Sequence, residues 1–314
     1  RNRKNNDLGE RNFRSTKYLL NKAKEVERMK LKWRNYFFNR IHTRPAFMLM
    51  TLVIIAGFVT FSGIPAQAQN RGGTFHAIIN PEPPMLVLGL SSNTPTQTVG
   101  GKIWSGLFTY SFDLEPVPVL AKSYTKSTDG LTYTFKLRKN VKWHDGHPFS
   151  AEDVIFSFTK FLPEVSARAR LIFNRAKNVT APDPYTVVIT LNEPFPALML
   201  GFDVSTSPIV PKHIYEGTDY WNNPANNHPI GTGPFKFKEW KKGNYIHLVR
   251  NDEYFKSGKP YLDEIYFHII PDAGQRVIAL ETEKVYMSSF GDIEWFDVNR
   301  LKGMPHLKLI TKGY

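Results

Sequence analysis

Residues 129–158 read DGLTYTFKLRKNVKWHDGHPFSAEDVIFSF, and this stretch decides the fold class of the chain. Apolar and polar side chains alternate over residues 131–137, which is typical of a β-strand with one buried face. Ser150 can then cap a helix whose first turn carries Glu152 and Asp153, and acidic residues favour the positive end of the helix dipole. A strand and a helix therefore follow each other closely, which indicates a mixed α/β fold.

Strand patterns and helix patterns also alternate over the rest of residues 69–314, and turns that contain Pro and Gly separate them. Further strands are expected at 72–79, 141–143, 186–191, 235–240, 245–249 and 265–270. Helices are expected at 99–108, 150–162 and 274–284, and residues 91–98 are expected to form a polar loop.

The charge of the chain is concentrated at its N-terminal end. The formal net charge is +13, and residues 1–68 hold 14 basic and 4 acidic side chains, which gives +10 and leaves +3 for the rest. A nucleic-acid-binding domain needs its basic residues on the folded body, so we expect no nucleic-acid partner. The absence of Cys excludes a disulfide scaffold, a thiol nucleophile and a lipid-modified cysteine.

Residues 46–64 are uncharged and follow a basic stretch, and Pro65, Ala66 and Ala68 come directly after them. These are the parts of a secretory signal, which predicts cleavage after Ala68 and a location in the periplasm. The alternative is a permanent membrane helix, because nineteen uncharged residues nearly reach the ~20 that span a bilayer.

Met29 opens a conventional signal sequence, so residues 29–68 are interpreted as the signal peptide. Residues 1–28 are then an upstream extension. The alternative is a basic segment that contacts anionic lipid.

Five spaced motifs resemble those of the family 5 extracellular solute-binding proteins, the peptide- and nickel-type binding proteins of ABC importers. In chain order they are LTYTFKLR (131–138), VKWHDG (141–146), PFSAEDV (148–154), PIGTGPF (229–235) and RND (250–252), the last followed by Tyr254 and Phe255. The resemblance extends over residues 71–300.

This resemblance implies an α/β, two-lobed Venus-flytrap fold with the ligand between the lobes. The first lobe would be split between residues 69–112 and 230–280, and residues 113–229 would form an inserted domain. Residues 281–314 would begin a second lobe that is largely missing, since family members are longer than this chain. With one wall of the cleft, this chain is expected to bind solute weakly.

The function implied is that of a periplasmic substrate-binding component of an ABC importer. It would bind peptides, work with a permease in the inner membrane, be a monomer, need no cofactor and have no enzyme activity. The same scaffold could instead bind a nickel chelate, an oligosaccharide or an opine-like compound. A further alternative is a membrane-anchored sensory or interaction protein that retains residues 46–64 as a span.

Candidate ligand contacts lie in three segments, because binding residues favour loops on a rigid scaffold. The segments are the loop 91–98, the loop before Pro208 and the family motif at 229–235, for each of which a plain surface loop is the alternative. The candidate residues are Ser92, Asn93, Thr96, Gln97, Thr206, Ser207 and Thr232. Gly231 and Gly233 would let the backbone approach a ligand, and the motif lacks the Lys of a phosphate loop.

Other chemistry finds little support in the sequence. His144 and His147 are three residues apart with no third ligand near them in sequence, so we expect no metal site. A G-x-S-x-G nucleophile motif is absent. Trp143, Phe149 and Phe156 are expected to be packing residues, and Phe158 is expected to be buried on the apolar face of the helix that begins at Ser150.

Overall fold

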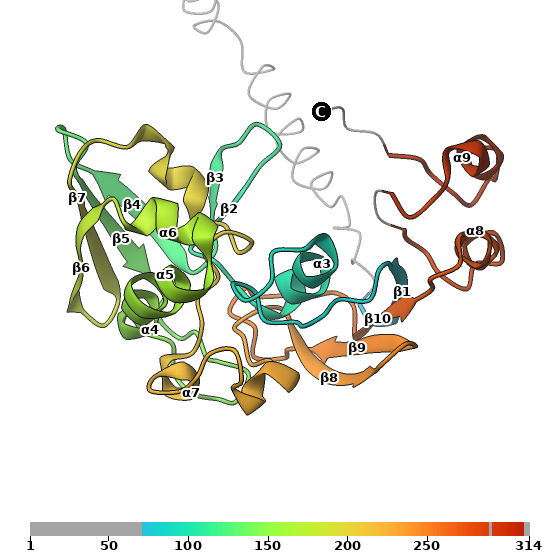
Figure 1. Ribbon diagram of the computed structural model, residues 1–314, viewed down its shortest axis with the longest axis horizontal. Coiled ribbons are helices and arrows are strands. Elements are labelled where there is room, and N and C mark those ends of the chain that lie inside the picture. Colours follow the sequence, from blue (N-terminus) through green and yellow to red (C-terminus); the bar gives the residue numbers. More distant parts are fainter. Residues whose placement is uncertain (1–70, 289–290, 311–314) are drawn as a thin grey trace, which may run out of the picture. The chain divides into compact units, whose positions relative to one another are not determined.

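Two four-stranded sheets organise residues 71–288 and 291–310, the residues that this computed structural model describes (Figure 1). The first sheet has the order β1-β10-β9-β8 and the second the order β4-β5-β7-β6. The first sheet consists of β1 (Thr74–Ile79), β8 (Phe235–Lys241), β9 (Tyr245–Arg250) and β10 (Glu264–Ile269). The second consists of β4 (Ala121–Lys126), β5 (Thr132–Leu137), β6 (Ala176–Asp183) and β7 (Thr186–Leu191). The expected mixed α/β class is thereby confirmed.

The first sheet joins two distant parts of the chain. β1 runs parallel to β10, whereas β10, β9 and β8 are antiparallel neighbours, and the strands expected at 235–240 and 245–249 are confirmed as β8 and β9. Its buried face carries Ala77, Ile246, Leu248 and Phe267. Residues 286–287 run along the other edge of β1, where Tyr286 N–H donates to His76 O over 2.8 Å.

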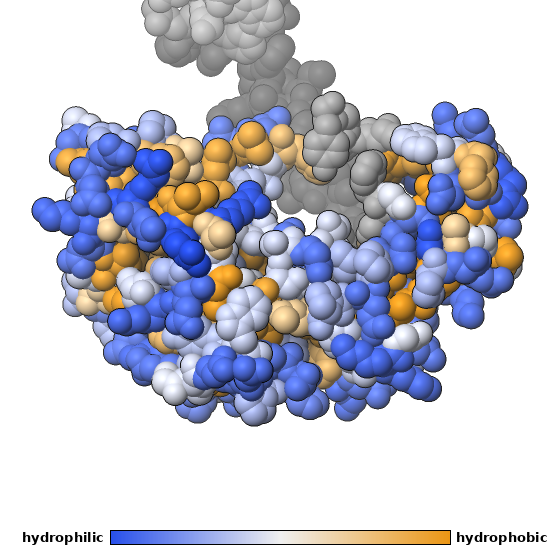
Figure 2. Space-filling model, in the orientation of Figure 1, coloured by the Kyte–Doolittle hydropathy of each residue, from blue (hydrophilic) through white to orange (hydrophobic). Residues whose placement is uncertain are grey.

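The second sheet lies wholly within residues 113–229, and its neighbouring strands are all antiparallel. Tyr133, Phe135 and Leu137 of β5 are buried, as their alternation predicts. A separate hairpin of β2 (Phe108–Tyr110) and β3 (Pro116–Pro118) precedes this sheet. Figure 2 shows apolar residues gathered over that hairpin, and its exposed apolar side chains are Phe112, Leu114 and Val117.

A helical run covers one face of the second sheet. It begins as α4 (Ala151–Phe156), passes through one π-helical segment (Ser157–Phe161) and ends as α5 (Leu162–Val165), followed by α6 (Ala167–Phe173). Ser150 caps α4 as expected: its hydroxyl accepts from Glu152 N, and Asp153 closes a capping box by accepting from Ser150 N. Phe158 is buried, and its ring stacks on that of Phe173 with centroids 4.2 Å apart.

The helix expected at 99–108 was placed too late in the sequence. The structure has α3 at Thr94–Ile103, so the expected loop 91–98 is largely helical. Asn93 caps this helix by accepting from Thr96 N over 2.8 Å, and Pro95 lies in its first turn, where a missing N–H costs nothing. Residues 104–108 leave the helix and pack against the loop 202–209.

The strand expected at 141–143 is also wrong, because this segment forms one isolated bridge, between Lys142 and Pro148. The helix expected at 274–284 is confirmed as α8 (Ala273–Glu281). The remaining helices are short: η2 (Pro196–Gly201), α7 (Lys212–Tyr215), η3 (Pro224–Asn227) and α9 (Trp295–Lys302).

No helix within residues 71–288 and 291–310 is both long and apolar enough to cross a membrane. The expected extension 1–28 and signal peptide 29–68, with Ala66 and Ala68, lie outside the described residues.

Candidate ligand-binding region

The segment 229–235 lies against the C-terminal end of α3. Gly233 N–H donates to Ile103 O over 2.8 Å. A Cβ atom on Gly231 would lie 1.9 Å from that same oxygen, and one on Gly233 would lie 2.5 Å from it. Because atoms cannot approach so closely, both positions require glycine for backbone-to-backbone packing.

His144 holds this segment from its other side. His144 N–H donates to Gly231 O over 2.9 Å, Gly231 N–H donates to His144 Nδ1 over 3.2 Å, and His144 Nε2 lies 3.0 Å from Gly233 O. An accepting Nδ1 and a donating Nε2 define a neutral ring. Burial lowers the pKa of His144 to about 4, and Lys236 acts in the same direction.

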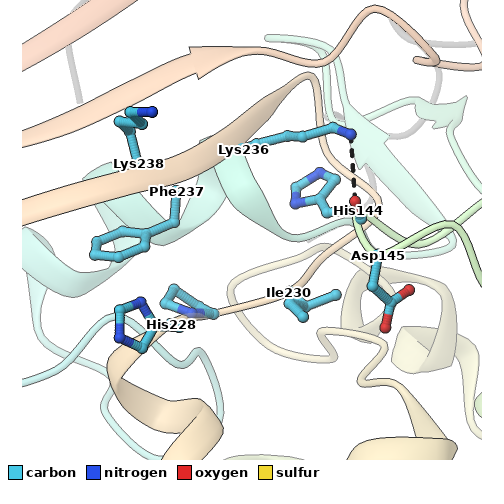
Figure 3. A pocket seen from close by; sticks show the side chains of 8 residues that line it. His144, Asp145, His228, Ile230, Lys236, Phe237 and Lys238 are labelled. Carbon is cyan, nitrogen blue, oxygen red and sulfur yellow. Dashed lines mark hydrogen bonds between the residues drawn. The ribbon is translucent and has the colours of Figure 1, made fainter.

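A shallow pocket lies between the turn that carries His144 and strand β8 (Figure 3). Lys236 Nζ donates to His144 O over 3.2 Å at one side of it, and Phe237 and Lys238 come from the same strand. Its lining consists of His144, Asp145, His228, Pro229, Ile230, Lys236, Phe237 and Lys238. None of the seven residues predicted to contact ligand lines this pocket.

Four of the predicted residues lie at the N-terminal end of α3. Asn93 is its cap, Thr96 Oγ1 donates to Met85 O over 2.8 Å, and Gln97 Nε2 donates to Ser92 O over 2.7 Å. Thr96 is fully buried, whereas Ser92 and Asn93 are exposed. Thr96 and Gln97 therefore stabilise the start of the helix, and the exposed groups are those of Ser92 and Asn93.

Thr206 and Ser207 belong to the buried loop 202–209. Ile209 N–H donates to Ser105 O over 3.0 Å, which fixes this loop beside the residues that follow α3. Ser207 Oγ donates to Gly201 O. Thr206 Oγ1 is buried without a hydrogen-bond partner among the described residues.

Thr232 is 1% exposed, and its hydroxyl likewise has no partner among the described residues. A buried hydroxyl without a partner loses its hydrogen bonds to water without replacing them. Such a group calls for a specific explanation, for example a ligand or an ordered water. The unpartnered hydroxyls of Thr206 and Thr232 thus lie in segments that pack near the C-terminal end of α3.

The structure therefore divides the predicted residues between the two ends of one helix. α3 has ten residues, which corresponds to a length of about 15 Å. Ser92, Asn93, Thr96 and Gln97 lie at or near its start, and Thr206, Ser207 and Thr232 belong to segments packed against residues 103–108.

Asp153 has a second structural role that the sequence does not reveal. Besides closing the capping box of α4, it accepts from Lys212 N over 3.0 Å, so it joins α4 to α7. Burial raises its pKa, and its backbone hydrogen bonds oppose that effect. The capping role follows from its spacing to Ser150, but the bond to a residue far along the chain has no local signal.

Residues 115–312 match the family model described as bacterial extracellular solute-binding proteins, family 5 Middle. The oligopeptide-binding protein AppA of Bacillus subtilis is 35% identical over 202 residues, which cover 61% of this chain and 35% of the relative. The glutathione-binding protein GsiB of Pectobacterium atrosepticum is 32% identical over 193 residues, covering 61% and 37%.

Solved structures of solute-binding proteins are also similar to this chain. AppA of Bacillus subtilis in complex with a nonapeptide has a TM-score of 0.67 and 29% identity, covering 75% of this chain and 47% of that one. AgaA from A. tumefaciens R10 in complex with agropinic acid has a TM-score of 0.67 and 33% identity, covering 74% and 46%. The chain spans about a third of the curated relatives and about half of these solved chains. The family model matches more than half of the residues of this chain. The chain therefore belongs to the bacterial extracellular solute-binding proteins of family 5.

Proposed function

We propose that the protein is the periplasmic solute-binding component of an ABC importer and that its solutes are peptides. Family membership is the observation that carries the proposal, supported by relatives named for binding oligopeptides and glutathione. Its partner would be an inner-membrane permease, which recognises the form closed around solute. Hinge closure between lobes is a common way to enclose a ligand without covalent chemistry.

The lobe boundaries are part of the same proposal. Residues 69–112 and 230–280 form the first lobe, residues 113–229 the inserted domain, and residues from 281 on begin the second lobe. The parallel pairing of β1 with β10 supports a first lobe built from two stretches of chain. The confinement of β4 to β7 within residues 113–229 supports the insertion.

We assign ligand contact to groups at both ends of α3, of which Ser92, Asn93 and Thr232 belong to the first lobe and Thr206 to the inserted domain. Ser92 and Asn93 offer exposed polar groups at its start, and Thr206 and Thr232 hold unpartnered hydroxyls near its end. An extended peptide rises about 3.3 Å per residue, so four to five residues span the ~15 Å between the two ends. Thr96, Gln97 and Ser207 position the backbone and do not contact ligand directly.

An opine-like solute is the second candidate, because AgaA was solved with agropinic acid and matches this chain as well as AppA does. Thermal unfolding of the gene product that carries this chain, measured with di- to nonapeptides and with agropinic acid, distinguishes the two. We expect peptides to raise the melting temperature. A rise with agropinic acid alone would replace the proposed solute class.

Export and processing are proposed with it. Cleavage after Ala68 would leave Gln69 as the first residue of the periplasmic protein. N-terminal sequencing of protein from the periplasmic fraction tests this, and a sequence that retains residues 46–64 would favour a membrane anchor.

A further inference from the structure

A carboxylate and two imidazoles meet on the inserted domain, apart from the ligand contacts proposed above. His213 Nε2 lies 2.7 Å from Asp145 Oδ2, and the ring of His147 stacks on that of His213 with centroids 4.0 Å apart. One ligand atom from each of the three residues lies within 4.8 Å of the others. Within residues 71–288 and 291–310, no other group of three His, Cys, Asp or Glu side chains meets this condition.

We propose that Asp145, His147 and His213 form a binding site for one divalent transition-metal ion of the zinc class. Imidazole nitrogens and a carboxylate oxygen are ligands that Zn²⁺ accepts, and three protein ligands leave the fourth tetrahedral position to water. Neutral imidazoles also suit Ni²⁺ and Cu²⁺, so the class is defined by its preference for nitrogen ligands.

The fold presents these ligands before any ion arrives. Asp145 and His147 share a tight turn, in which Trp143 N–H donates to His147 O over 2.8 Å and Gly146 has a positive φ of 93°. His147 N–H also donates to Asp145 Oδ1 over 3.1 Å. His213 comes from α7, which the bond from Lys212 N to Asp153 anchors. Little chain entropy remains to be lost on binding.

The required movement is small. Two ligands bound at ~2.0–2.1 Å in tetrahedral geometry lie about 3.3 Å apart. The 2.7 Å contact between Asp145 and His213 would open slightly, and His147 Nδ1, now 4.0 Å from Asp145 Oδ1, would move closer. The His147 side chain is 62% exposed, so its ring can turn without disturbing the core.

The neighbouring residues leave the site accessible. The ring of His144 is engaged with Gly231 and Gly233, and the Asp145 carboxylate points away from it (Figure 3). The ammonium of Lys212 is paired with Glu152 over 2.9 Å, which offsets its repulsion of a cation. A bound ion would tie the turn 143–147 to α7.

Calorimetric titration of the purified protein with ZnCl₂ tests the site. We expect one ion per chain, and we expect His147→Gln and Asp145→Asn each to weaken the affinity at least tenfold. His228→Gln is the matched control, because it removes an exposed histidine that is not in the trio. The control should bind like the natural protein.

Two results would overturn the proposal: no saturable one-site binding tighter than ~1 mM, or unchanged affinity in His147→Gln. Thermal unfolding provides a second measurement on the same proteins. Zn²⁺ should raise the melting temperature of the natural protein and of His228→Gln but not that of His147→Gln, because a ligand that binds the folded state stabilises it. An equal rise in all three would place the ion elsewhere.

Discussion

His144 and Gly231 are joined by two hydrogen bonds that run in opposite directions. The His144 backbone N–H donates to Gly231 O over 2.9 Å, and the Gly231 N–H donates to His144 Nδ1 over 3.2 Å. One histidine of the proposed inserted domain thereby fixes the segment that leads into β8.

The first prediction is that stability decreases as the pH falls from about 6.5 to about 4. Burial lowers the pKa of folded His144 to about 4, below the ordinary value of ~6.5 that the unfolded chain has. The unfolded state therefore binds more protons in this range, and stability rises with pH across it and is constant above. Of the charged groups that act on the ring, Lys236 lowers the pKa of His144 and Asp145 raises it. The loss is at most roughly 3 kcal/mol.

Urea unfolding of the natural protein and of His144→Gln, in EDTA between pH 4.5 and 8, measures this effect. Other groups titrate in both proteins, so the quantity of interest is the difference between the two stabilities. That difference should shrink toward low pH. A difference independent of pH would show that His144 does not carry the effect.

The second prediction concerns the glycine contact with α3. Gly231→Ala places a Cβ against Ile103 O, and overpacking of this kind typically costs ~1–3 kcal/mol. Gly101→Ala is the control, because its Cβ would enter open space within α3 and should stabilise the helix by ~0.5–1 kcal/mol. Denaturant unfolding of both variants measures their free energies of unfolding. Equal changes in the two would contradict the close packing of Gly231 against Ile103 O.

The third prediction ranks the stability costs of two substitutions in the helical run that Ser150 caps. Phe158→Ala removes a fully buried ring and should cost ~3–5 kcal/mol. Ser150→Ala removes a cap hydrogen bond and should cost ~1 kcal/mol. Guanidinium unfolding at one pH tests the order, and a reversed order would refute the burial assigned to Phe158.

The fourth prediction separates a ligand contact from a packing residue. Thr232→Val keeps the shape of the side chain but removes the unpartnered hydroxyl, so stability should stay the same or rise by up to ~2 kcal/mol. Peptide affinity should fall about three- to tenfold, which corresponds to one lost hydrogen bond. Calorimetry with a bound peptide measures the affinity. A stable variant with unchanged affinity would remove Thr232 from the proposed site.

The sequence predicts those elements that have one buried face. β5 alternates between apolar and polar side chains, and β7 is rich in β-branched residues, so the sequence predicts both where they occur. β4 and β6 were not predicted, because they are the edge strands of their sheet and most of their side chains are exposed. Their position in the sheet is fixed by hydrogen bonds to neighbours, which local patterns do not encode.

The candidate site was less predictable than the fold. Asn93 and Pro95 are both start signals for a helix, so the polar loop could have been recognised as the beginning of α3. The group of Asp145, His147 and His213 could not have been recognised from the sequence, because His213 reaches the turn through tertiary packing. The unpartnered hydroxyls of Thr206 and Thr232 also depend on packing between separate segments.

Native mass spectrometry of the gene product that carries this chain, purified from periplasm without refolding, tests the proposed function most directly. We predict additional masses that fragment as peptides, that are lost after partial unfolding and dialysis, and that return when synthetic peptide is added. A protein that carries no solute and gains none from a peptide mixture, or one that retains a solute of another class, would contradict peptide binding.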